Sequence, residues 1–244
     1  MYDDIIIYTF IIQKEMKREL KKFFFIRKKD SVQTFRLAVL LCIVGGFLDA
    51  YTFTTRGKVL ANAQTGNLVY LAVNLAERNY QKVFSYFVPI FVFALGILFS
   101  EYLKHIFTKY ENFRWQHTAI IIQLIVMFFI SFIPSNHLNM LVNVIISFIA
   151  ALQYQGFRRI HGVNGATTMC TGNLRSGMEF LSLFIKTKDK VYFYDFLVYI
   201  GLISFFVIGA TLCAVLVQFF KNYALLVCCV LQFIVFLVMF KQKI

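Results

Sequence analysis

Long apolar segments constrain this chain more than any other feature of its sequence. A transmembrane α-helix needs about 20 consecutive apolar residues, and several segments approach or exceed that length. Only 15% of the 244 residues are charged, whereas soluble domains contain about 25%. The segments are rich in Ile and Phe and do not alternate between apolar and polar residues, which favours helices over barrel strands. The sequence therefore predicts an all-α integral membrane protein, with apolar segments at 35–55, 83–104, 115–133, 138–157, 191–220 and 223–240.

Two weaker apolar segments, residues 59–77 and 164–185, leave the number of crossings at six or eight. Lys and Arg concentrate in cytoplasmic connections, so their distribution separates the two counts. If both weaker segments cross, five of these charges lie in internal cytoplasmic connections and eight lie outside. If neither crosses, eight lie inside and five outside. The charges therefore favour six transmembrane helices, with both weaker segments returning to the side from which they entered.

The length of the first weaker segment fits a re-entrant half-helix. Its helical part runs from Thr65 to Ala76, which is about 18 Å at a rise of 1.5 Å per residue. The hydrocarbon core of a bilayer is about 30 Å thick. Such a helix extends from the membrane surface to the midplane, so we expect two re-entrant half-helices, one in each weaker segment.

The tetrapeptide TGNL occurs twice, at 65–68 and 171–174, at the same point of two similar halves. Residues 35–133 and 138–240 each have the order span, re-entrant segment, span, span. Each half crosses three times, which is an odd number, so the second half is inverted relative to the first. Inverted repeats with interrupted helices are a recurring plan of transporters, whose sites lie at the midplane. We therefore predict one membrane domain made of two inverted three-span repeats.

The first 34 residues are predicted to form a basic segment in the cytoplasm. The chain has a net charge of +13, and basic residues crowd the region just before the first span. This is the pattern that keeps an N-terminus inside the cell, and it would also attract anionic lipids. A nucleic-acid partner fits less well because the cluster adjoins a membrane span. We expect both termini in the cytoplasm, with the basic cluster formed by Lys14, Lys17, Arg18, Lys21, Lys22, Arg27, Lys28 and Lys29.

Two sequence blocks resemble a known family. The block 45-GGFLDAYTFTTRGKVLANAQTGNLVYLA-72 resembles the signature of the YoaK-like bacterial inner-membrane proteins. The block 151-ALQYQGFRRIHGVNGATTMCTGNLRSG-177 is similar to the second signature of that family. The resemblance implies a multi-span protein of the bacterial cytoplasmic membrane, and it implies no particular substrate because the family has no settled function. The N-terminal extension departs from the family pattern.

The repeated TGN segments are the candidate functional site. Thr can cap a helix N-terminus, and a helix start leaves unpaired N–H groups and a partial positive charge. Two starts that converge at the midplane would bind an anion, a carboxylate or a carbonyl oxygen. The alternative is that Thr and Asn only bond neighbouring helices and that Gly permits close packing. The residues predicted to line a substrate path are Asp49, Asn62, Gln64, Thr65, Gly66, Asn67, Gln155, Thr171, Gly172 and Asn173.

Charged residues near this path have two interpretations each. Asp49 is the only acid within the first five apolar segments apart from their ends, and such a carboxylate marks a path or a coupling site by default. It could equally lie near the outer end of its span and bind water or Arg56. Arg158 and Arg159 follow the fourth span, where they anchor the topology or attract anions to the inner mouth.

Three classes of function remain after these observations. The leading hypothesis is a transporter or channel for a small polar or anionic solute. A receptor or assembly protein that transports nothing is the alternative, and the sequence leaves a homo-oligomer open. A membrane-embedded enzyme fits least, because HExxH, GxSxG and paired intramembrane aspartates are missing from the sequence. We expect no catalytic residues, no metal and no cofactor.

Overall fold

The computed structural model describes residues 35–107, 115–135, 138–157, 167–168 and 170–241. Arg158 and Arg159, and the predicted basic segment 1–34, lie outside these residues. The described part of the chain is helical, without strands. Its elements, in order, are α2 (Phe35–Thr55), α3 (Gln64–Ala76), α4 (Tyr80–Phe107), α5 (Trp115–Ile130), α6 (Asn139–Gly156), α7 (Cys170–Thr187), α8 (Lys190–Phe220), the short 3-10 helix η1 (Lys221–Ala224) and α9 (Leu225–Lys241).

Three described stretches are long and apolar enough to cross a membrane: α2, α4, and the stretch Lys190–Phe240 that joins α8, η1 and α9. Helix α5 is a shorter apolar helix. Large apolar side chains cover the outside of the bundle, and Leu98, Phe129 and Phe219 are each more than 60% exposed. Water would not favour such a surface, whereas lipid would. The fold is that of an α-helical membrane protein, as the composition predicts.

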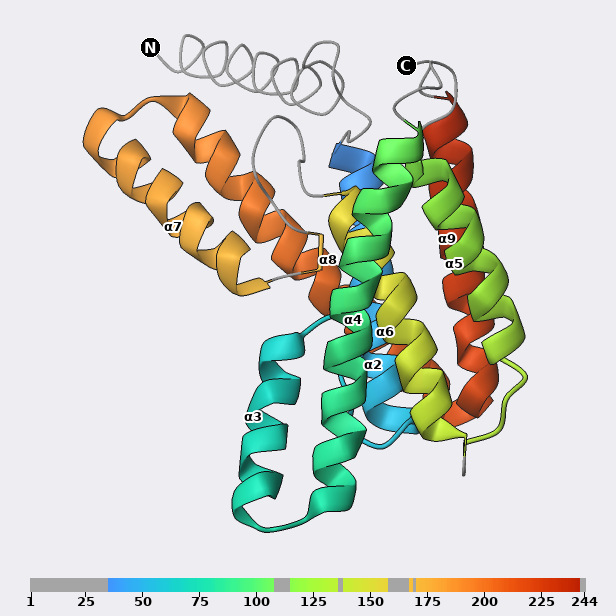
Figure 1. The fold of residues 1–244 in the computed structure, drawn as a ribbon. Coiled ribbons are helices and arrows are strands. Elements are labelled where there is room, and N and C mark those ends of the chain that lie inside the picture. The colour runs from blue at the N-terminus through green and yellow to red at the C-terminus, as the bar shows by residue number, and fades with distance from the viewer. Residues whose placement is uncertain (1–34, 108–114, 136–137, 158–166, 169, 242–244) are drawn as a thin grey trace, which may run out of the picture.

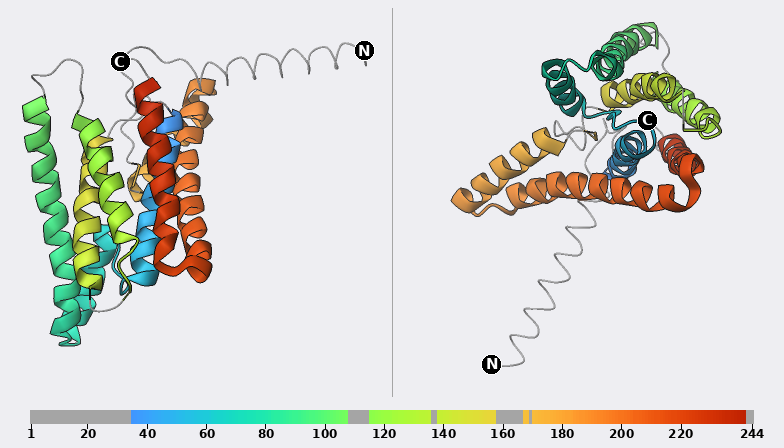
Figure 2. Two further views of the ribbon diagram at one scale, coloured as in Figure 1. Left: turned by 90° about the vertical axis from the view of Figure 1, so that its right-hand side faces the viewer. Right: turned by 90° about the horizontal axis from the view of Figure 1, so that it is seen from below.

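The long helices pack in two pairs. Helix α2 packs on α8, and α6 packs on α4. Helix α5 contacts α6, α9 contacts α2, and α5 and α9 contact each other. The short helices lie at the edges, α3 against α4 and α7 against α8. The view from below in Figure 2 shows the α3–α4 hairpin and the α7–α8 hairpin on opposite sides of the molecule.

Glycines allow the long pairs to approach closely. A Cβ atom on Gly209 of α8 would lie 2.1 Å from the backbone oxygen of Ile43 in α2. A Cβ atom on Gly96 of α4 would lie 2.9 Å from the backbone oxygen of Phe148 in α6. Both positions therefore need glycine because backbone lies where a side chain would be. Close approach at small residues is the usual way in which membrane helices associate.

The α3–α4 and α7–α8 hairpins have the same type of turn, in which a residue with positive φ is followed by Asn or Asp. Arg78 follows α3 with φ +58°, and Lys188 follows α7 with φ +58°. The next residue, Asn79 or Asp189, directly precedes the first residue of the long helix. Asn79 Oδ1 accepts a hydrogen bond from the backbone N–H of Lys82 (3.4 Å), and Asp189 Oδ1 accepts one from Val191 (2.9 Å). Asn and Asp are favoured N-cap residues, so each sequence signals a turn followed by a new helix.

The short helices run in opposite directions from the middle of the bundle. In Figure 1, α3 begins beside the middle of α2 and runs to the lower end, where α4 starts. Helix α7 also begins near the middle and runs to the upper end, where α8 starts. Each short helix therefore ends at the same end of the bundle at which the following long helix begins.

Candidate functional site

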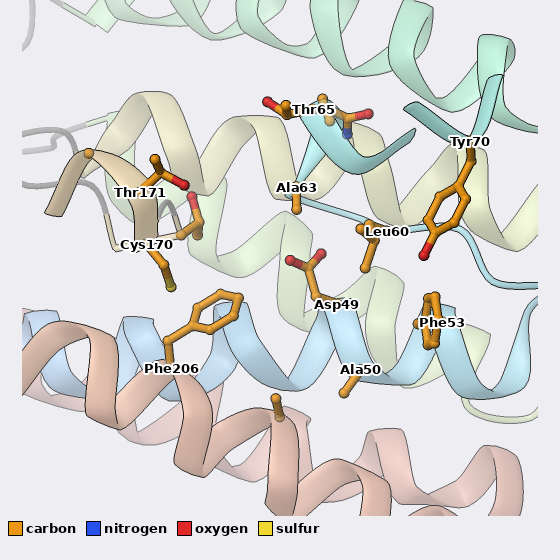
Figure 3. Close-up of a pocket in the computed structure, with 14 residues that line it drawn as sticks. Asp49, Ala50, Phe53, Leu60, Ala63, Thr65, Tyr70, Cys170, Thr171 and Phe206 are labelled. Carbon is orange, nitrogen blue, oxygen red and sulfur yellow. The ribbon is translucent and has the colours of Figure 1, made fainter. Parts of the chain in front are cut away.

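A cavity of about 530 Å³ lies between the first turns of α3 and α7 (Figure 3). Helices α2 and α8 form its floor, and the turns that precede the two short helices contribute to its walls. The cavity therefore combines residues from both TGN segments with residues of two long helices. Its lining residues are Asp49, Ala50, Phe53, Leu60, Ala63, Gln64, Thr65, Tyr70, Thr168, Cys170, Thr171, Gly172, Phe206 and Ala210.

Both turns reach the middle of α2. Gly45 is the central residue of this helix, with ten helical residues on either side. Asn62 Nδ2, in the turn before α3, donates a hydrogen bond to the backbone oxygen of Gly45 (3.1 Å). Thr168, before α7, lies so close that a Cβ atom on Gly45 would be 2.9 Å from its Cγ2. The two polar segments therefore meet about halfway along the bundle.

Asp49 lies between the cavity and the turn that precedes α3. Its Oδ1 accepts a hydrogen bond of 2.6 Å from the backbone N–H of Asn62 and one of 3.4 Å from Asn62 Nδ2. Only 5% of the residue is exposed, yet the carboxylate points into the cavity in Figure 3. Asp49 therefore fixes the turn before α3 and also places a carboxylate in the wall of the cavity.

Arg56 does not pair with Asp49, although the sequence left this open. Its guanidinium is buried and faces the turn between α5 and α6. Nη1 donates to the backbone oxygen of Pro134 (2.9 Å) and to Asn139 Oδ1 (3.2 Å). Nη2 donates to the backbone oxygen of Ile133 (2.6 Å) and to the hydroxyl of Tyr51 (2.8 Å). Arg56 therefore ties the end of α2 to the α5–α6 turn, away from the cavity.

Asn67 holds the extended segment before α3. Its Oδ1 accepts a hydrogen bond from the backbone N–H of Leu60 (2.9 Å). Its Nδ2 donates to the backbone oxygen of Leu60 (2.7 Å) and to Gln64 Oε1 (2.9 Å). Both backbone groups of Leu60 are thus paired by one amide side chain. Asn67 is buried and contributes to the turn, whereas Gln64 also lines the cavity.

The other members of the two TGN segments take different positions. Thr65, Thr171 and Gly172 line the cavity. Gly66 lies under Leu60, since a Cβ atom there would be 2.6 Å from Leu60 Cδ1. Asn173 is buried, like Asn67. The repeated sequence therefore gives each helix start one exposed Thr in the cavity lining and one buried Asn.

Thr65 does not cap α3, although the sequence allowed that role. The helix begins at Gln64, and Ala63 is its N-cap residue, with no side-chain hydrogen bond to the helix. Thr65 is the second helical residue, and Thr171 is the second residue of α7, which begins at Cys170. Neither Thr is therefore the residue before its helix, and both belong to the cavity lining.

Gln155 does not line the cavity. It lies near the end of α6, where its Nε2 donates a hydrogen bond to Glu101 Oε1 of α4. Asn62 is also absent from the lining, although it bonds Asp49 directly. The structure thus brings together five of the predicted path residues: Asp49, Gln64, Thr65, Thr171 and Gly172.

Three aromatic residues of the cavity were missed by sequence reasoning. Phe53 lies one turn after Asp49 on α2, Tyr70 lies on α3, and Phe206 lies on α8. Tyr70 stacks on Tyr86 of α4, with ring centroids 5.4 Å apart. Phe53 could have been found from its i, i+4 spacing with Asp49. Phe206 carries no such signal, because many Phe residues on the apolar helices face lipid.

Among the described residues, no three His, Cys, Asp or Glu side chains are grouped as metal ligands. The described part of the chain thus offers hydroxyls, amides, rings and one carboxylate around the cavity. Most of these groups are carried by helices α2, α3, α7 and α8.

The fold and the cavity define an α-helical membrane protein with a mainly apolar cavity that contains one carboxylate and several other polar groups. The sequence matches a protein family described as "Protein of unknown function (DUF1275)" over residues 37–238. This match covers most of the chain and all of the cavity, so the chain belongs to that family. It is also 23% identical over 209 residues to the UPF0700 transmembrane protein YoaK of Bacillus subtilis (strain 168). That alignment covers 81% of this chain and 90% of the relative. The YoaK-like resemblance is thereby confirmed. No solved structure matches the chain.

Proposed function

We propose that this protein moves a small polar solute across the bacterial cytoplasmic membrane, with the cavity as its central site. The observation that carries the proposal is the cavity itself, in which the starts of α3 and α7 and the carboxylate of Asp49 line one space beside the middle of α2. A carboxylate inside a membrane helix is unfavourable unless it faces protein or a watery space, and such residues commonly belong to solute or ion paths.

The proposed topology is six transmembrane helices and two re-entrant helices in an inverted repeat. Under this proposal α2, α3, α4 and α5 correspond to α6, α7, α8 and α9. The packing supports this correspondence. If each helix is replaced by its counterpart, the α2–α8 contact becomes the α6–α4 contact and the α3–α4 contact becomes the α7–α8 contact, and all four contacts are observed. By the same replacement the α5–α6 contact becomes the α9–α2 contact, which is also observed. The glycine contacts of Gly209 and Gly96 and the matched hairpin turns follow the same exchange.

The non-helical backbone before each short helix needs hydrogen-bond partners inside a membrane. Backbone N–H and C=O groups that lack partners cannot face lipid, because each would be destabilised by several kcal/mol. The segment between α2 and α3 must therefore be covered by protein or face water. Asn67 and Asp49 pair some of these groups, and the cavity provides space beside them. The unpaired N–H groups at the two helix starts then face a solute instead of lipid.

The second candidate function is a receptor or assembly protein whose polar centre is closed. The observation that favours it is the hydrogen bonding of Asn67 and Asp49 within the turn, which needs no solute. Passage and closure differ in one respect, namely whether water-soluble reagents reach the cavity from both sides. Catalysis is not part of either proposal.

The test is thiol labelling of Thr65→Cys and Thr171→Cys. Cys170 lines the cavity, so the background is Cys170→Ser; the other four cysteines are buried. A membrane-impermeant maleimide is applied to intact cells and to inside-out vesicles. The proposal expects both positions to react from both sides. The buried control Ala119→Cys stays unlabelled in both preparations. If neither Thr65→Cys nor Thr171→Cys reacts from either side, the cavity is sealed and the receptor or assembly function replaces transport.

A further inference from the structure

The charge of the cavity lining is unusual for a site that would bind an anion. Asp49 is the one acidic residue in the lining, and the described residues contribute no Lys, Arg or His to it. Among the described residues, two cations that follow Asp49 along the chain lie elsewhere. Arg56 faces the α5–α6 turn, and Lys58 lies outside the lining, with Nζ 4.6 Å from the centroid of the Phe53 ring. In the part of the lining that the described residues form, an anionic solute would therefore meet a carboxylate and no basic side chain.

Aromatic rings flank this carboxylate. In Figure 3 the Asp49 carboxylate lies between Phe206 on one side and Phe53 on the other, with Tyr70 beyond Phe53. The face of an aromatic ring attracts cations, most strongly where water is excluded. A carboxylate with rings on both sides is the combination that binds an organic ammonium group. The contact between Lys58 and Phe53 shows that an ammonium group already uses one of these rings.

The helix starts supply the opposite charge. Each helix N-terminus has a partial charge of roughly +0.5, and the first residues of α3 and α7 line the cavity. Two such partial charges balance the single negative charge of Asp49. A solute with a net charge of either sign would meet repulsion from one of the two groups. A net-neutral solute that carries both signs would meet favourable charges at both of its ends.

We propose that the solute is a small zwitterion, whose ammonium group binds at Asp49 between the rings of Phe53 and Phe206. Its carboxylate faces the first turns of α3 and α7 and the hydroxyls of Thr65 and Thr171. This inference rests on the proposed function and names the substrate class of the same cavity. It also replaces the anionic solute that the helix starts alone would suggest.

Binding of matched compounds to the purified full chain in lipid nanodiscs tests the inference. Two zwitterions serve as probes, glycine betaine with a quaternary ammonium and γ-aminobutyrate with a primary one. Their carbon isosteres, 3,3-dimethylbutyrate and pentanoate, keep the carboxylate and lose the positive charge. Choline keeps the ammonium and loses the carboxylate. Titration calorimetry should show at least one zwitterion binding about tenfold or more tightly than its isostere and more tightly than choline.

Variants then locate the ammonium group. Asp49→Asn keeps an Oδ1 acceptor for the backbone N–H of Asn62, so the turn before α3 is retained. We expect it to lose about tenfold or more in affinity for the favoured zwitterion, with little change for the isostere. Phe206→Leu keeps the carboxylate and should give a smaller loss. Glu101→Gln is the matched control, since Glu101 binds Gln155 outside the cavity, and it should bind like the wild type.

The two proposals fail in different ways. If neither zwitterion binds more tightly than its isostere, or if choline binds most tightly, the zwitterion inference is overturned. Labelling of Thr65→Cys and Thr171→Cys from both sides would then still support transport of another solute. If a zwitterion binds but the cavity is sealed to the thiol reagent, the site is a zwitterion receptor and the transport proposal is overturned.

Discussion

The backbone N–H of Asn62 donates a 2.6 Å hydrogen bond to Oδ1 of Asp49, which precedes it by 13 residues. This bond turns the chain back after α2, so that α3 starts beside the middle of that helix. Thr168, from the second half of the chain, packs against Gly45, which lies one helical turn before Asp49 on α2. The central cavity therefore depends on contacts that both halves make with a few residues of α2.

Replacement of Asn67 by Leu should destabilise the turn before α3. The substitution leaves the backbone N–H and C=O of Leu60 without their partners, and each buried, unpaired group is destabilising by about 1–3 kcal/mol. We expect thermal unfolding in detergent to report a loss of about 2 kcal/mol or more. Asn74→Leu is the control. Asn74 only adds a bond to Tyr70 O within α3, so its loss should be clearly smaller. Equal losses in the two variants would contradict the role of Asn67.

Replacement of Gly209 by Ala should separate α2 from α8. The added Cβ atom would lie 2.1 Å from the backbone oxygen of Ile43, and backbone cannot move aside as a flexible side chain can. Overpacking of this kind destabilises by about 1–3 kcal/mol. Gly172→Ala is the matched control, because no atom lies within 4 Å of its added Cβ atom. Thermal unfolding should show a lower midpoint for Gly209→Ala alone. An unchanged midpoint for this variant would argue against the close α2–α8 packing.

Replacement of Arg56 by Met should loosen the end of α2. Met fills similar space but removes the hydrogen bonds to Ile133, Pro134 and Tyr51. Hydrogen bonds to charged groups contribute about 1.5–3 kcal/mol each, so we expect a loss of about 3 kcal/mol or more. Lys58→Met, at a nearby exposed residue, should change stability little. Proteolysis of the α5–α6 turn gives a second readout, which should accelerate only in Arg56→Met.

The sequence predicts the helices well because apolar length is a strong signal. Each of the six predicted apolar segments contains a helix, and the predicted half-helix from Thr65 to Ala76 is observed as Gln64–Ala76. The sequence analysis placed Asp49, Thr65 and Thr171 on one predicted path, Asp49 as an acid within an apolar segment and the two Thr residues as members of the repeated TGNL, and all three line the cavity. Six crossings, re-entrant helices and the inverted repeat stay predictions that await the experiments described.

Local side-chain chemistry was harder to predict. The sequence allowed Thr65 to cap α3, but the helix starts one residue earlier and has no side-chain cap. Gln155 was predicted to line the substrate path, yet its Nε2 donates a hydrogen bond to Glu101 on another helix. Phe206 reaches the cavity only because α8 packs against α2. Such contacts depend on helix packing between distant segments, which the apolar pattern of one sequence does not contain.

The central claim is that α3 and α7 each begin near the middle of the membrane and run to opposite faces of it. Single cysteines at the exposed positions Glu77 and Thr187 test it most directly, because these residues lie at the outer ends of α3 and α7. Both are placed in the Cys170→Ser background and treated with an impermeant maleimide. We predict that Glu77→Cys reacts in intact cells and that Thr187→Cys reacts only in inside-out vesicles. Reaction of both positions from the cytoplasmic face would mean that the two helices cross the membrane completely, and it would contradict the account.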